Sequence, residues 1–451
     1  MLSYNEAISY IGSIPWTKRK PGLHRMRILM DMLGNPQDRL KFIHVAGTNG
    51  KGSACAMLAS VFKEAGYRTG LFTSPHLIKY NERMKINGAD IDDEEFARLI
   101  SDVSEAAGKM EEGPSEFEIL TAAGFLWFYE KKCDIVILEV GLGGELDSTN
   151  VISAKELALI MPIGYDHTAI LGDDIKNIAG AKAGIITENV DVVMAFQNNP
   201  AEISEKKEVT PDSLKIESVI RNRCAKKNAF LHVPDAKDFE LISSDIEGQI
   251  FKNAYTDAPV FLRLSGAYQR QNALAVLEAI KVIKSKDNGF VIEEQHILDG
   301  LRNVKWNARF EVLNRNPVFI LDGAHNDHGI KAAVKSLKDI YPDKKIIYIL
   351  GILSDKNIEE MLEELYTNAE RFITLTPDSG RALSGDILAE RIREAGFEAE
   401  SLNNTEEAII RALELCMNRK NDFNDPADEG VICSLGSLYL AGEIRNYFMK
   451  E

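Results

Sequence analysis

Short, almost continuous apolar runs alternate along the chain with longer stretches in which apolar residues recur at helical spacing. Eight such runs are expected to form strands, at residues 41–46, 134–140, 157–161, 192–196, 318–321, 345–350, 372–375 and 431–434. Continuous apolarity, in place of strict alternation, is typical of strands covered on both faces within a parallel sheet. Helices are expected between them, for example at 53–66, 117–130, 271–284 and 357–366. The alternation predicts a doubly wound α/β architecture.

The strand–helix series falls into two blocks, which predicts two domains. The chain has 451 residues, whereas one domain commonly holds roughly 100–200 residues. We expect an N-terminal domain over residues 1–305, a linker over 306–316 and a C-terminal domain over 317–451. The polar stretch 200–256 is expected to form a small β-rich insertion near the end of the first domain.

Composition and charge narrow the class of protein. Lysine and arginine number 53 and aspartate and glutamate 69, so the formal net charge is −16. A field of that sign repels phosphate backbones and anionic lipid, which argues against nucleic-acid or membrane partners. Five scattered cysteines, none at CxxC spacing, do not indicate a disulfide framework or a zinc site. We find no signal peptide and no run of about 18 apolar residues, so a cytoplasmic protein is expected.

The sharpest chemical signal is HVAGTNGKGS at residues 44–53, which follows an apolar strand and begins a helix. Its glycines let backbone N–H groups converge on phosphate oxygens, and the helix N-terminus adds positive potential. Lys51 is expected to reach the β- and γ-phosphates, and the Ser53 hydroxyl to bind magnesium. The spacing differs from GxxxxGK[ST] because a glycine precedes the serine, and a turn without a ligand is the alternative. The predicted nucleotide-binding residues are Gly47, Thr48, Asn49, Gly50, Lys51, Gly52 and Ser53.

Further motifs follow in order: TSPHL at 73–77, LEVGLGG at 138–144, DSTNV at 147–151, DHTAILG at 166–172, AKAGII at 181–186, LDGAHN at 321–326, GILSDKN at 351–357 and GSLYLAGEIR at 436–445. With GTNGKGS, the series resembles the ATP-dependent Mur ligase superfamily and, within it, the folylpolyglutamate/dihydrofolate synthase family. Only residues 187–260 lack recognisable motifs. The resemblance implies a P-loop Mur-ligase-type ATPase domain with a mainly parallel sheet and a smaller Rossmann-like C-terminal α/β domain.

The resemblance also implies two magnesium ions. In the family, the serine of the SPH motif and the glutamate of the EVG motif hold one ion, and the histidine of the DH motif holds the other. These positions are Ser74, Glu139 and His167. Glu139, at a strand end, is of the type that a hard cation prefers, whereas histidine is an unusual magnesium ligand. Lys182 matches the lysine that the family carbamylates; without the motif, it would be taken for an ordinary surface lysine.

Four further positions match residues that the family directs at ATP. Asp322 and His325 match residues of the second domain that reach ATP, and Arg309 matches a linker arginine that contacts the phosphates. Asn272 matches an asparagine that contacts the nucleotide. A turn aspartate, a linker arginine and a helix-surface amide are the ordinary alternatives. The resemblance indicates three catalytic residues: Lys51, Lys182 and His325.

Two segments match the family's folate pocket, SEFE at 115–118 and LDS at 146–148, and TKRKPGLHRM at 17–26 resembles its pterin-side loop. The expected substrate-binding residues are Phe117, Glu118, Leu146, Asp147 and Ser148. Many bifunctional members have arginine where this chain has Glu145, and some also have histidine at Tyr268 and glutamate at Ala181. These departures favour reduced folate over dihydropteroate as the acceptor.

The activity implied by the resemblance is ATP-dependent addition of L-glutamate to tetrahydrofolate polyglutamates by a carbon–nitrogen ligase. Phosphoryl transfer turns a carboxylate into an acyl phosphate, from which the glutamate amine displaces phosphate. Closure of two domains would assemble such a site and limit wasteful ATP hydrolysis. A monomer is expected, with ATP, L-glutamate and folate as its partners. Three alternatives stay open: a bifunctional enzyme that also accepts dihydropteroate, a ligase for another acid or amino acid, and a nucleotide-gated binding protein without catalysis.

Overall fold

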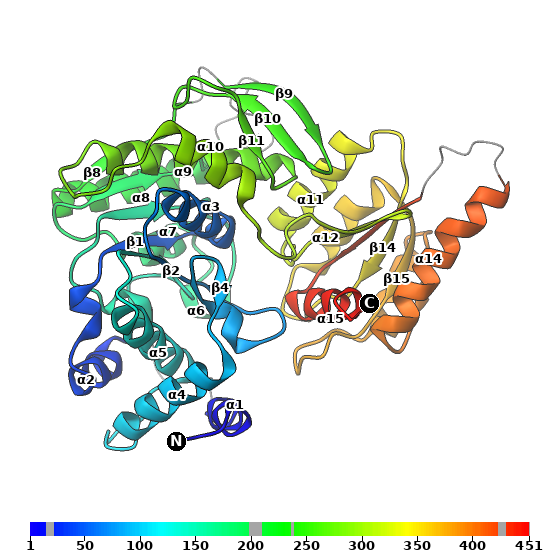
Figure 1. The fold of residues 1–451 in the computed structure, drawn as a ribbon. Coiled ribbons are helices and arrows are strands. Elements are labelled where there is room, and N and C mark those ends of the chain that lie inside the picture. The colour runs from blue at the N-terminus through cyan, green and yellow to red at the C-terminus, as the bar shows by residue number, and fades with distance from the viewer. Residues whose placement is uncertain (15–21, 198–209, 236–238, 423–429, 451) are drawn as a thin grey trace. The chain divides into compact units, whose positions relative to one another are not determined.

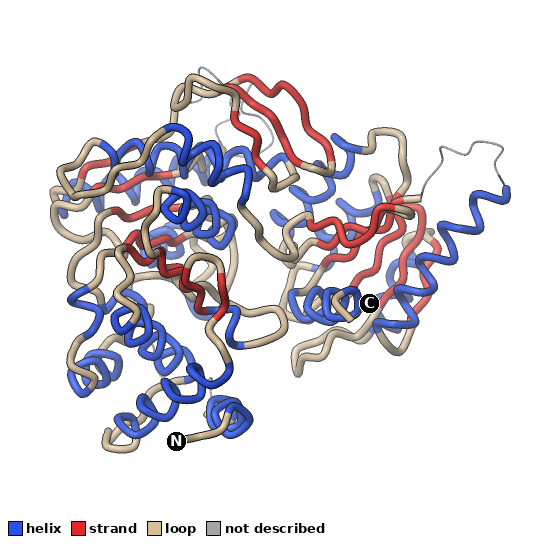
Figure 2. The backbone as a smooth tube through the Cα atoms, in the orientation of Figure 1, coloured by secondary structure: helices blue, strands red, loops and turns tan. Residues whose placement is uncertain are grey.

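The computed structural model describes residues 1–14, 22–197, 210–235, 239–422 and 430–450 (Figure 1). The chain divides into two compact units. The first comprises Met1–Glu240, Lys252–Val260 and Gln271–Val304, and the second comprises Leu241–Phe251, Phe261–Arg270 and Lys305–Glu451. Each unit is built on a mainly parallel sheet with helices packed against it (Figure 2), which confirms the predicted α/β class.

The sheet of the first unit has the order β4-β3-β2-β5-β1-β6-β7-β8. The strands from β2 to β8 in this order are parallel, and β3 and β4 add an antiparallel edge. Every residue of the two central strands, β1 and β5, is buried. This confirms that continuous apolar runs marked strands covered on both faces. The strand bounds are β1 Phe42–Ala46, β2 Thr69–Phe72, β3 Met84–Ile86, β4 Ala89–Asp90, β5 Ile135–Glu139, β6 Leu157–Ile160, β7 Asp191–Met194 and β8 Phe230–His232.

Two apolar cores of the first unit use different helices. One contains buried side chains of α1, α2, α4 and α5, and the other contains buried side chains of α7 and α8. Helix α3 follows β1 directly, so its N-terminus lies at the carboxyl end of a central strand. The helices are α1 Tyr4–Gly12, α2 His24–Met32, α3 Lys51–Glu64, α4 Asp93–Ala107, α5 Glu116–Glu130, α6 Thr168–Leu171, α7 Ile175–Ala183, α8 Pro211–Lys227, α9 Ala267–Lys284 and α10 Glu294–Asn303, with 3₁₀ turns η1 Pro36–Arg39, η2 Tyr80–Arg83 and η3 Ser148–Val151.

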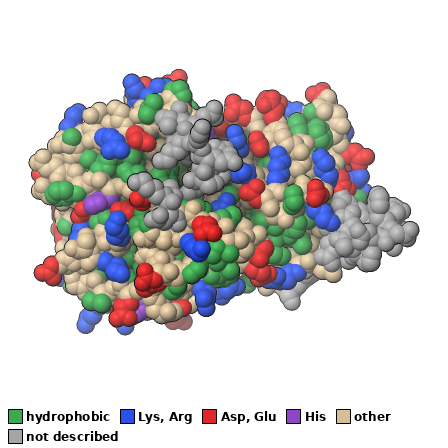
Figure 3. All heavy atoms as spheres, turned by 90° about the horizontal axis from the view of Figure 1, so that it is seen from above, with side chains coloured by type: hydrophobic (Ala, Val, Ile, Leu, Met, Phe, Trp, Pro, Cys, Tyr) green, Lys and Arg blue, Asp and Glu red, His purple; other side chains and the backbone are tan. Residues whose placement is uncertain are grey.

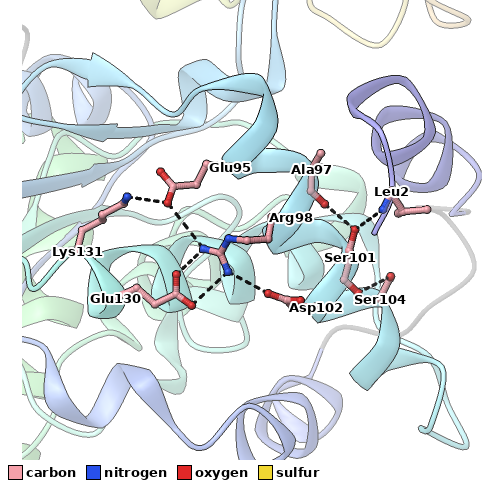
Figure 4. Close-up of polar contacts among 9 residues, drawn as sticks. All are labelled: Leu2, Glu95, Ala97, Arg98, Ser101, Asp102, Ser104, Glu130 and Lys131. Carbon is pink, nitrogen blue, oxygen red and sulfur yellow. Dashed lines mark hydrogen bonds and ion pairs between the residues drawn. The ribbon is translucent and has the colours of Figure 1, made fainter.

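A polar cluster joins α4 to the end of α5 at the surface (Figure 4). The guanidinium of Arg98 on α4 lies between Glu130 on α5 and Asp102 one turn further along α4. Glu95 forms ion pairs with both Arg98 and Lys131, at 3.7 and 2.7 Å. Such networks fix the lateral position of neighbouring helices more than they stabilise the fold, because surface ion pairs contribute roughly 0–1 kcal/mol each.

The expectation of a β-rich segment at 200–256 is partly wrong. Residues 200–209 and 236–238 lie outside the described residues, but Pro211–Lys227 forms helix α8. Ile216, Ile220 and Cys224 recur every four residues and are buried, while the intervening positions are largely polar. The helix was missed because only three of its seventeen residues are buried apolar ones, and the further apolar residues Leu214 and Val219 blur the helical period. The Thr210 side chain caps its start by accepting from the backbone N–H of Ser213. Strands β9 Glu240–Asp245 and β10 Gly248–Lys252 do follow, and with β11 Val260–Leu262 they form a three-stranded sheet.

The sheet of the second unit has the order β12-β13-β17-β14-β15-β16 and is parallel except for β12. Its strands are β12 Glu311–Arg315, β13 Val318–Leu321, β14 Ile346–Leu350, β15 Ala369–Thr374, β16 Glu398–Ser401 and β17 Val431–Leu435. Its helices are α11 Asp327–Ile340, α12 Ile358–Tyr366, α13 Gly385–Glu394, α14 Thr405–Asp422 and α15 Leu438–Phe448. The expected linker at 306–316 differs from the structure, because it contains β12. This strand pairs with β13 and escaped notice because its side chains are only partly buried and lack an apolar run.

The surface shows no large patch of one charge among the described side chains on the face drawn in Figure 3, where acidic and basic groups are interspersed. All five cysteines are buried and none is in a disulfide. Within the described ranges, no helix is both long enough and apolar enough to cross a lipid bilayer.

Candidate active site

The loop between β1 and α3 passes so close to its neighbours that two of its positions leave no space for a side chain. Gly47 has φ +153°, and a Cβ there would lie 2.6 Å from Cβ of Met161. Gly50 has φ +81°, and a Cβ there would lie 2.4 Å from Oδ1 of Asn272. Glycine is therefore required at both positions. Asn272, on α9, lies against the loop as expected for a residue that contacts a nucleotide there.

Thr48 joins this loop to the one that follows β6. Its backbone N–H donates to the carbonyl of Pro162 at 2.8 Å, and its hydroxyl donates to the carbonyl of Gly164 at 3.0 Å. The N–H of Gly164 donates back to the same hydroxyl at 3.0 Å. Lys51, the first residue of α3, donates from Nζ to the Thr48 carbonyl at 3.1 Å. The predicted phosphate loop and the loop that carries His167 are thus brought together.

The proposed magnesium ligands come from three strand ends. Ser74, in the loop after β2, donates from its backbone N–H to Oε2 of Glu139 at 3.0 Å, and Glu139 is 4% exposed. His167 has φ +52° at the start of α6, with a partly exposed side chain whose Nε2 lies 3.8 Å from Asp166. No three His, Cys, Asp or Glu side chains of the described part of the chain gather closely enough to hold a metal ion. The hydroxyl of Ser74 and the carboxylate of Glu139 are hard oxygen donors, so this pair fits Mg²⁺ that shares its coordination with phosphate and water.

Lys182 is not a surface lysine. It lies near the end of α7, is 4% exposed and donates from Nζ to the carbonyl of Gly47 at 2.8 Å. Burial lowers the pKa of Lys182 to about 7, and the positive charge of Lys51 lowers it as well. A substantial fraction of this amine is therefore neutral near pH 7.

The predicted folate residues lie around the loop that follows β5. Gly141 packs against Phe117, since a Cβ there would lie 2.5 Å from Cζ of the ring. Leu146 is 52% exposed, whereas Asp147 and Ser148 are buried. Leu146, Asp147 and Ser148 thus follow the carboxyl end of the central strand β5, where ligands of parallel sheets bind.

Glu118 differs from a simple ligand-binding carboxylate. Its Oε2 accepts from the backbone N–H of Ser115 at 2.6 Å and from Nε of Arg25 at 3.2 Å. The carboxylate caps α5 and pairs with a buried arginine, which holds the helix start in place. Arg25 belongs to the expected pterin-side loop; residues 17–21 of that segment lie outside the described residues.

The predicted residues of the second unit form a cluster of their own. Asp322, at the end of β13, accepts at Oδ2 from the Tyr268 hydroxyl and the Phe310 N–H, both at 2.8 Å, and at Oδ1 from the Ala324 N–H. Burial raises the pKa of Asp322, while the nearby Arg309 charge opposes the rise.

Arg309 and His325 each have a backbone carbonyl as a hydrogen-bond partner in this cluster. Arg309 donates to the carbonyl of Ala308 at 2.8 Å, and Nδ1 of His325 lies 2.9 Å from the carbonyl of Gly323. The loop approaches Arg309 closely, since a Cβ at Gly323 would lie 2.4 Å from its Nη1. The side chains of Arg309, Asp322 and His325 are thus arranged at one strand end of this unit.

One polar group beside the site was missed from the sequence: His44, Thr149 and Lys155. His44 is fully buried in β1 and bonds to both of the others. A histidine inside the otherwise apolar run FIHVA was the available signal, because a buried polar side chain needs partners.

Comparisons with known proteins agree with this arrangement. Residues 45–280 match the Mur ligase middle domain, and residues 308–423 match the Mur ligase glutamate ligase domain. The chain is 35% identical over 449 residues to a dihydrofolate synthase/folylpolyglutamate synthase of Bacillus subtilis, and 31% identical over 456 residues to a folylpolyglutamate synthase of Lacticaseibacillus casei, with 98% of each chain covered in both cases.

A solved structure extends the likeness to the fold. The Mycobacterium tuberculosis folylpolyglutamate synthase complexed with ADP has a TM-score of 0.87 and 28% identity, and the match covers 99% of this chain and 98% of that one. The protein therefore belongs to the Mur ligase family and, within it, to the folylpolyglutamate/dihydrofolate synthases.

Proposed function

We propose that this protein uses ATP to add L-glutamate to reduced folates, through an acyl phosphate of the folate's terminal carboxylate. The observation that carries the proposal is the phosphate loop at Gly47–Ser53, with Lys51 over it and Lys182 and Asn272 packed against it. Homologues named folylpolyglutamate synthase, and related structures solved with ADP, support ATP as the phosphoryl donor.

Residues of this chain would help to activate the folate carboxylate, which is a poor electrophile. A carboxylate resists attack by an amine because its leaving group would be oxide, whereas an acyl phosphate releases phosphate. Lys51 would neutralise charge on the γ-phosphoryl group as it moves to the folate carboxylate. The glutamate amine, in its neutral form, would then form the carbon–nitrogen bond and displace phosphate. Tight positioning matters because three anionic reactants must be held together.

Magnesium would be held by Ser74 and Glu139, with Ser53 and His167 as the further expected ligands. When bound, it would neutralise phosphate oxygens and so lower the cost of bringing ATP to the folate carboxylate. The short contact between the Ser74 backbone and Glu139 supports this pairing, because it sets the carboxylate beside the serine.

We also propose that Lys182 is carbamylated. The neutral amine would attack carbon dioxide, form a nitrogen–carbon bond and lose a proton, which leaves one negative charge. Burial and the pKa of about 7 support this step, because they supply an unprotonated amine. The nearby cation Lys51 would stabilise the resulting anion, and the remaining N–H could still donate to the Gly47 carbonyl.

The remaining roles are also proposals. Phe117, Glu118, Leu146, Asp147 and Ser148 would line or support the folate pocket, and Asn272 would contact the nucleotide. Three residues of the second unit would contact ATP and take part in the ligation of glutamate: Arg309, Asp322 and His325. We propose the domain roles expected from the sequence: residues 1–305 bind ATP and folate, and residues 317–451 complete the ligase function. We also propose that the protein is a monomer and acts in the cytoplasm.

Mass spectrometry of the reaction products tests the proposed activity directly. Purified protein is incubated with ATP, Mg²⁺, isotopically labelled L-glutamate and tetrahydrofolate. We expect one ADP released for each glutamate added, and no ADP above background when either folate or glutamate is omitted. Nucleotide binding or hydrolysis without any glutamylated product from a panel of reduced folates would instead favour the non-catalytic alternative.

A second acceptor, dihydropteroate, decides between one activity and two. Bifunctional synthases among the relatives favour this possibility, since the Bacillus subtilis homologue carries both names. Glu145 and Tyr268 argue for a weaker reaction with dihydropteroate than with tetrahydrofolate. Equal kcat/KM for the two acceptors would identify a bifunctional enzyme.

A further inference from the structure

We propose that His44 and Thr149 are positioning residues for the ligation, because with Lys155 they form a buried relay of hydrogen bonds that fixes Asp147 and the loop 141–147. The inference rests on the proposed function, since this loop carries part of the expected folate pocket. None of the three residues is among the predicted site residues, and all belong to the first unit.

The relay is an unbroken series of hydrogen bonds from Lys155 to Asp147. Nζ of Lys155 lies 3.2 Å from Nδ1 of His44, and Nε2 of His44 lies 2.9 Å from the Thr149 hydroxyl. That hydroxyl donates to Oδ1 of Asp147 at 2.5 Å. His44 and Thr149 are fully buried, and Asp147 is 6% exposed, so water does not substitute for these partners.

The direction of each bond follows by elimination. An ionised Asp147 can only accept hydrogen bonds, so the Thr149 hydroxyl donates to the carboxylate. The oxygen of that hydroxyl must then accept from Nε2–H of His44. Nδ1 of His44 is then an acceptor for Lys155. Lys155 also donates to the carbonyl of Ile185 at 2.7 Å and to Oδ1 of Asn150 at 3.3 Å. Burial lowers the pKa of His44, in accord with a neutral ring that donates from one nitrogen only.

Asp147 also forms hydrogen bonds with the loop after β5, and these connect the loop to the relay. Its Oδ2 accepts from the backbone N–H of Leu142 at 2.8 Å, and its own N–H donates to the Gly144 carbonyl at 3.2 Å. The carboxylate thereby closes the turn that begins two residues after Glu139 and ends beside Leu146. Without the Thr149 hydroxyl, the Asp147 carboxylate would be held by backbone N–H groups, among them those of Leu142 and Thr149, so we expect this turn, and with it the expected acceptor pocket, to loosen.

A purely structural role accounts poorly for this design. Every position of β1 is buried, and the other four hold Phe, Ile, Val and Ala. An apolar residue at position 44 would fill the strand without any need for partners, and buried polar groups rarely add stability over an apolar replacement. Hydrogen bonds of fixed direction that end on Asp147 are instead suited to holding a binding loop in one conformation. Residues behind a site commonly orient the side chains that touch the ligand.

The test compares Thr149→Val with Thr149→Ser. Valine keeps the shape and the backbone N–H that donates to Asp147 at 3.0 Å, but it has no hydroxyl to accept from His44 or donate to Asp147, whereas serine keeps the hydroxyl. We expect Thr149→Val to raise the KM for tetrahydrofolate about tenfold, with the Kd for ADP changed less than about twofold, and Thr149→Ser to stay near the parent values. In an Asp147→Asn background, Thr149→Val should add little, because the relay no longer ends on a carboxylate.

Hydrogen exchange of the backbone amides at 141–147 provides a readout that does not depend on activity. The relay predicts faster exchange there in Thr149→Val and parent-like exchange in Thr149→Ser. If the parent protein forms no glutamylated folate, the proposed function fails, yet the exchange result still decides the relay. Unchanged exchange and unchanged KM for folate in a folded Thr149→Val protein would overturn the proposal. Should that variant not fold, His44→Gln, which retains a side-chain N–H donor, is compared with His44→Phe in the same two measurements.

Discussion

Two loops of this molecule each follow a strand of a mainly parallel sheet and lead into a helix, and each has a buried ionisable side chain at it, a lysine in one case and an aspartate in the other. In the first unit, the loop after β1 leads into α3, and buried Lys182 donates to its Gly47 carbonyl. In the second unit, the loop after β13 leads into α11, and its first residue is the buried Asp322. Burial lowers the pKa of Lys182 to about 7 and raises the pKa of Asp322, so in both loops the charged form is disfavoured.

The difference lies in what compensates the buried charge. Asp322 accepts three hydrogen bonds from its own unit, from Tyr268, Phe310 and Ala324. Lys182 instead has the cation Lys51 as an electrostatic neighbour that lowers its pKa further, and the carboxylates of Asp166 and Asp147 oppose this effect. Hydrogen-bond donors already satisfy the carboxylate of Asp322, whereas the side-chain amines of Lys51 and Lys182 can both donate to an added anion. We therefore expect the first loop to respond more strongly to bound anions than the second loop does.

The largest effect is expected for Lys51→Ala, which removes a cation from the first loop. Loss of one charge-stabilising group from a phosphoryl-transfer site typically costs about 10²–10³ in rate, so we expect kcat/KM for glutamate addition to fall by about that factor. The exposed lysine Lys176, on α7, is a matched control that should leave the rate unchanged on replacement by alanine. A Lys51→Ala enzyme that works at the parent rate would contradict both the proposed function and the contrast between the loops.

The architecture of these loops was largely predictable from the sequence. Continuous apolar runs marked β1 and β13 because central parallel strands are buried on both faces, and the glycine pattern marked the first loop. Helix α8 and strand β12 were not predicted, since their stability comes from a few tertiary contacts and not from a strong local period.

The chemical environment of the site residues was much less predictable. Nothing in AKAGII indicates that Lys182 is buried beside the Gly47 carbonyl, because residues 135 positions apart meet only in the fold. The same holds for Glu118, which the sequence offered as a folate ligand and the structure pairs with Arg25. Residue identity gave the candidate chemistry, whereas burial and partners, which set each pKa, required the structure.

An intermediate effect is expected at Lys182. Lys182→Arg cannot form a carbamate and should lower kcat/KM about a hundredfold, while depletion of carbon dioxide should lower the parent rate and added bicarbonate should restore it. Because only the neutral amine reacts, the modified fraction at fixed carbon dioxide should rise as the pH rises through about 7. Carbon-13 NMR with labelled bicarbonate would detect the carbamate. An active Lys182→Arg enzyme, insensitive to bicarbonate, would show that burial of this amine serves packing alone.

The smallest effect is expected at the loop after β13, where Asp322 has three hydrogen-bond donors from its own unit. Tyr268→Phe removes one of the three donors to Asp322 and leaves the N–H groups of Phe310 and Ala324 in place. We expect the free energy of unfolding of the protein to fall by about 1 kcal/mol and kcat/KM to change by less than about fivefold. Denaturant titration and steady-state kinetics measure the two quantities, and Tyr268→His, which can donate from its ring, should recover part of the loss. If Tyr268→Phe reduced the rate as severely as Lys51→Ala, the backbone donors would be insufficient to hold Asp322. The second loop would then be as sensitive to the loss of one partner as the first loop is.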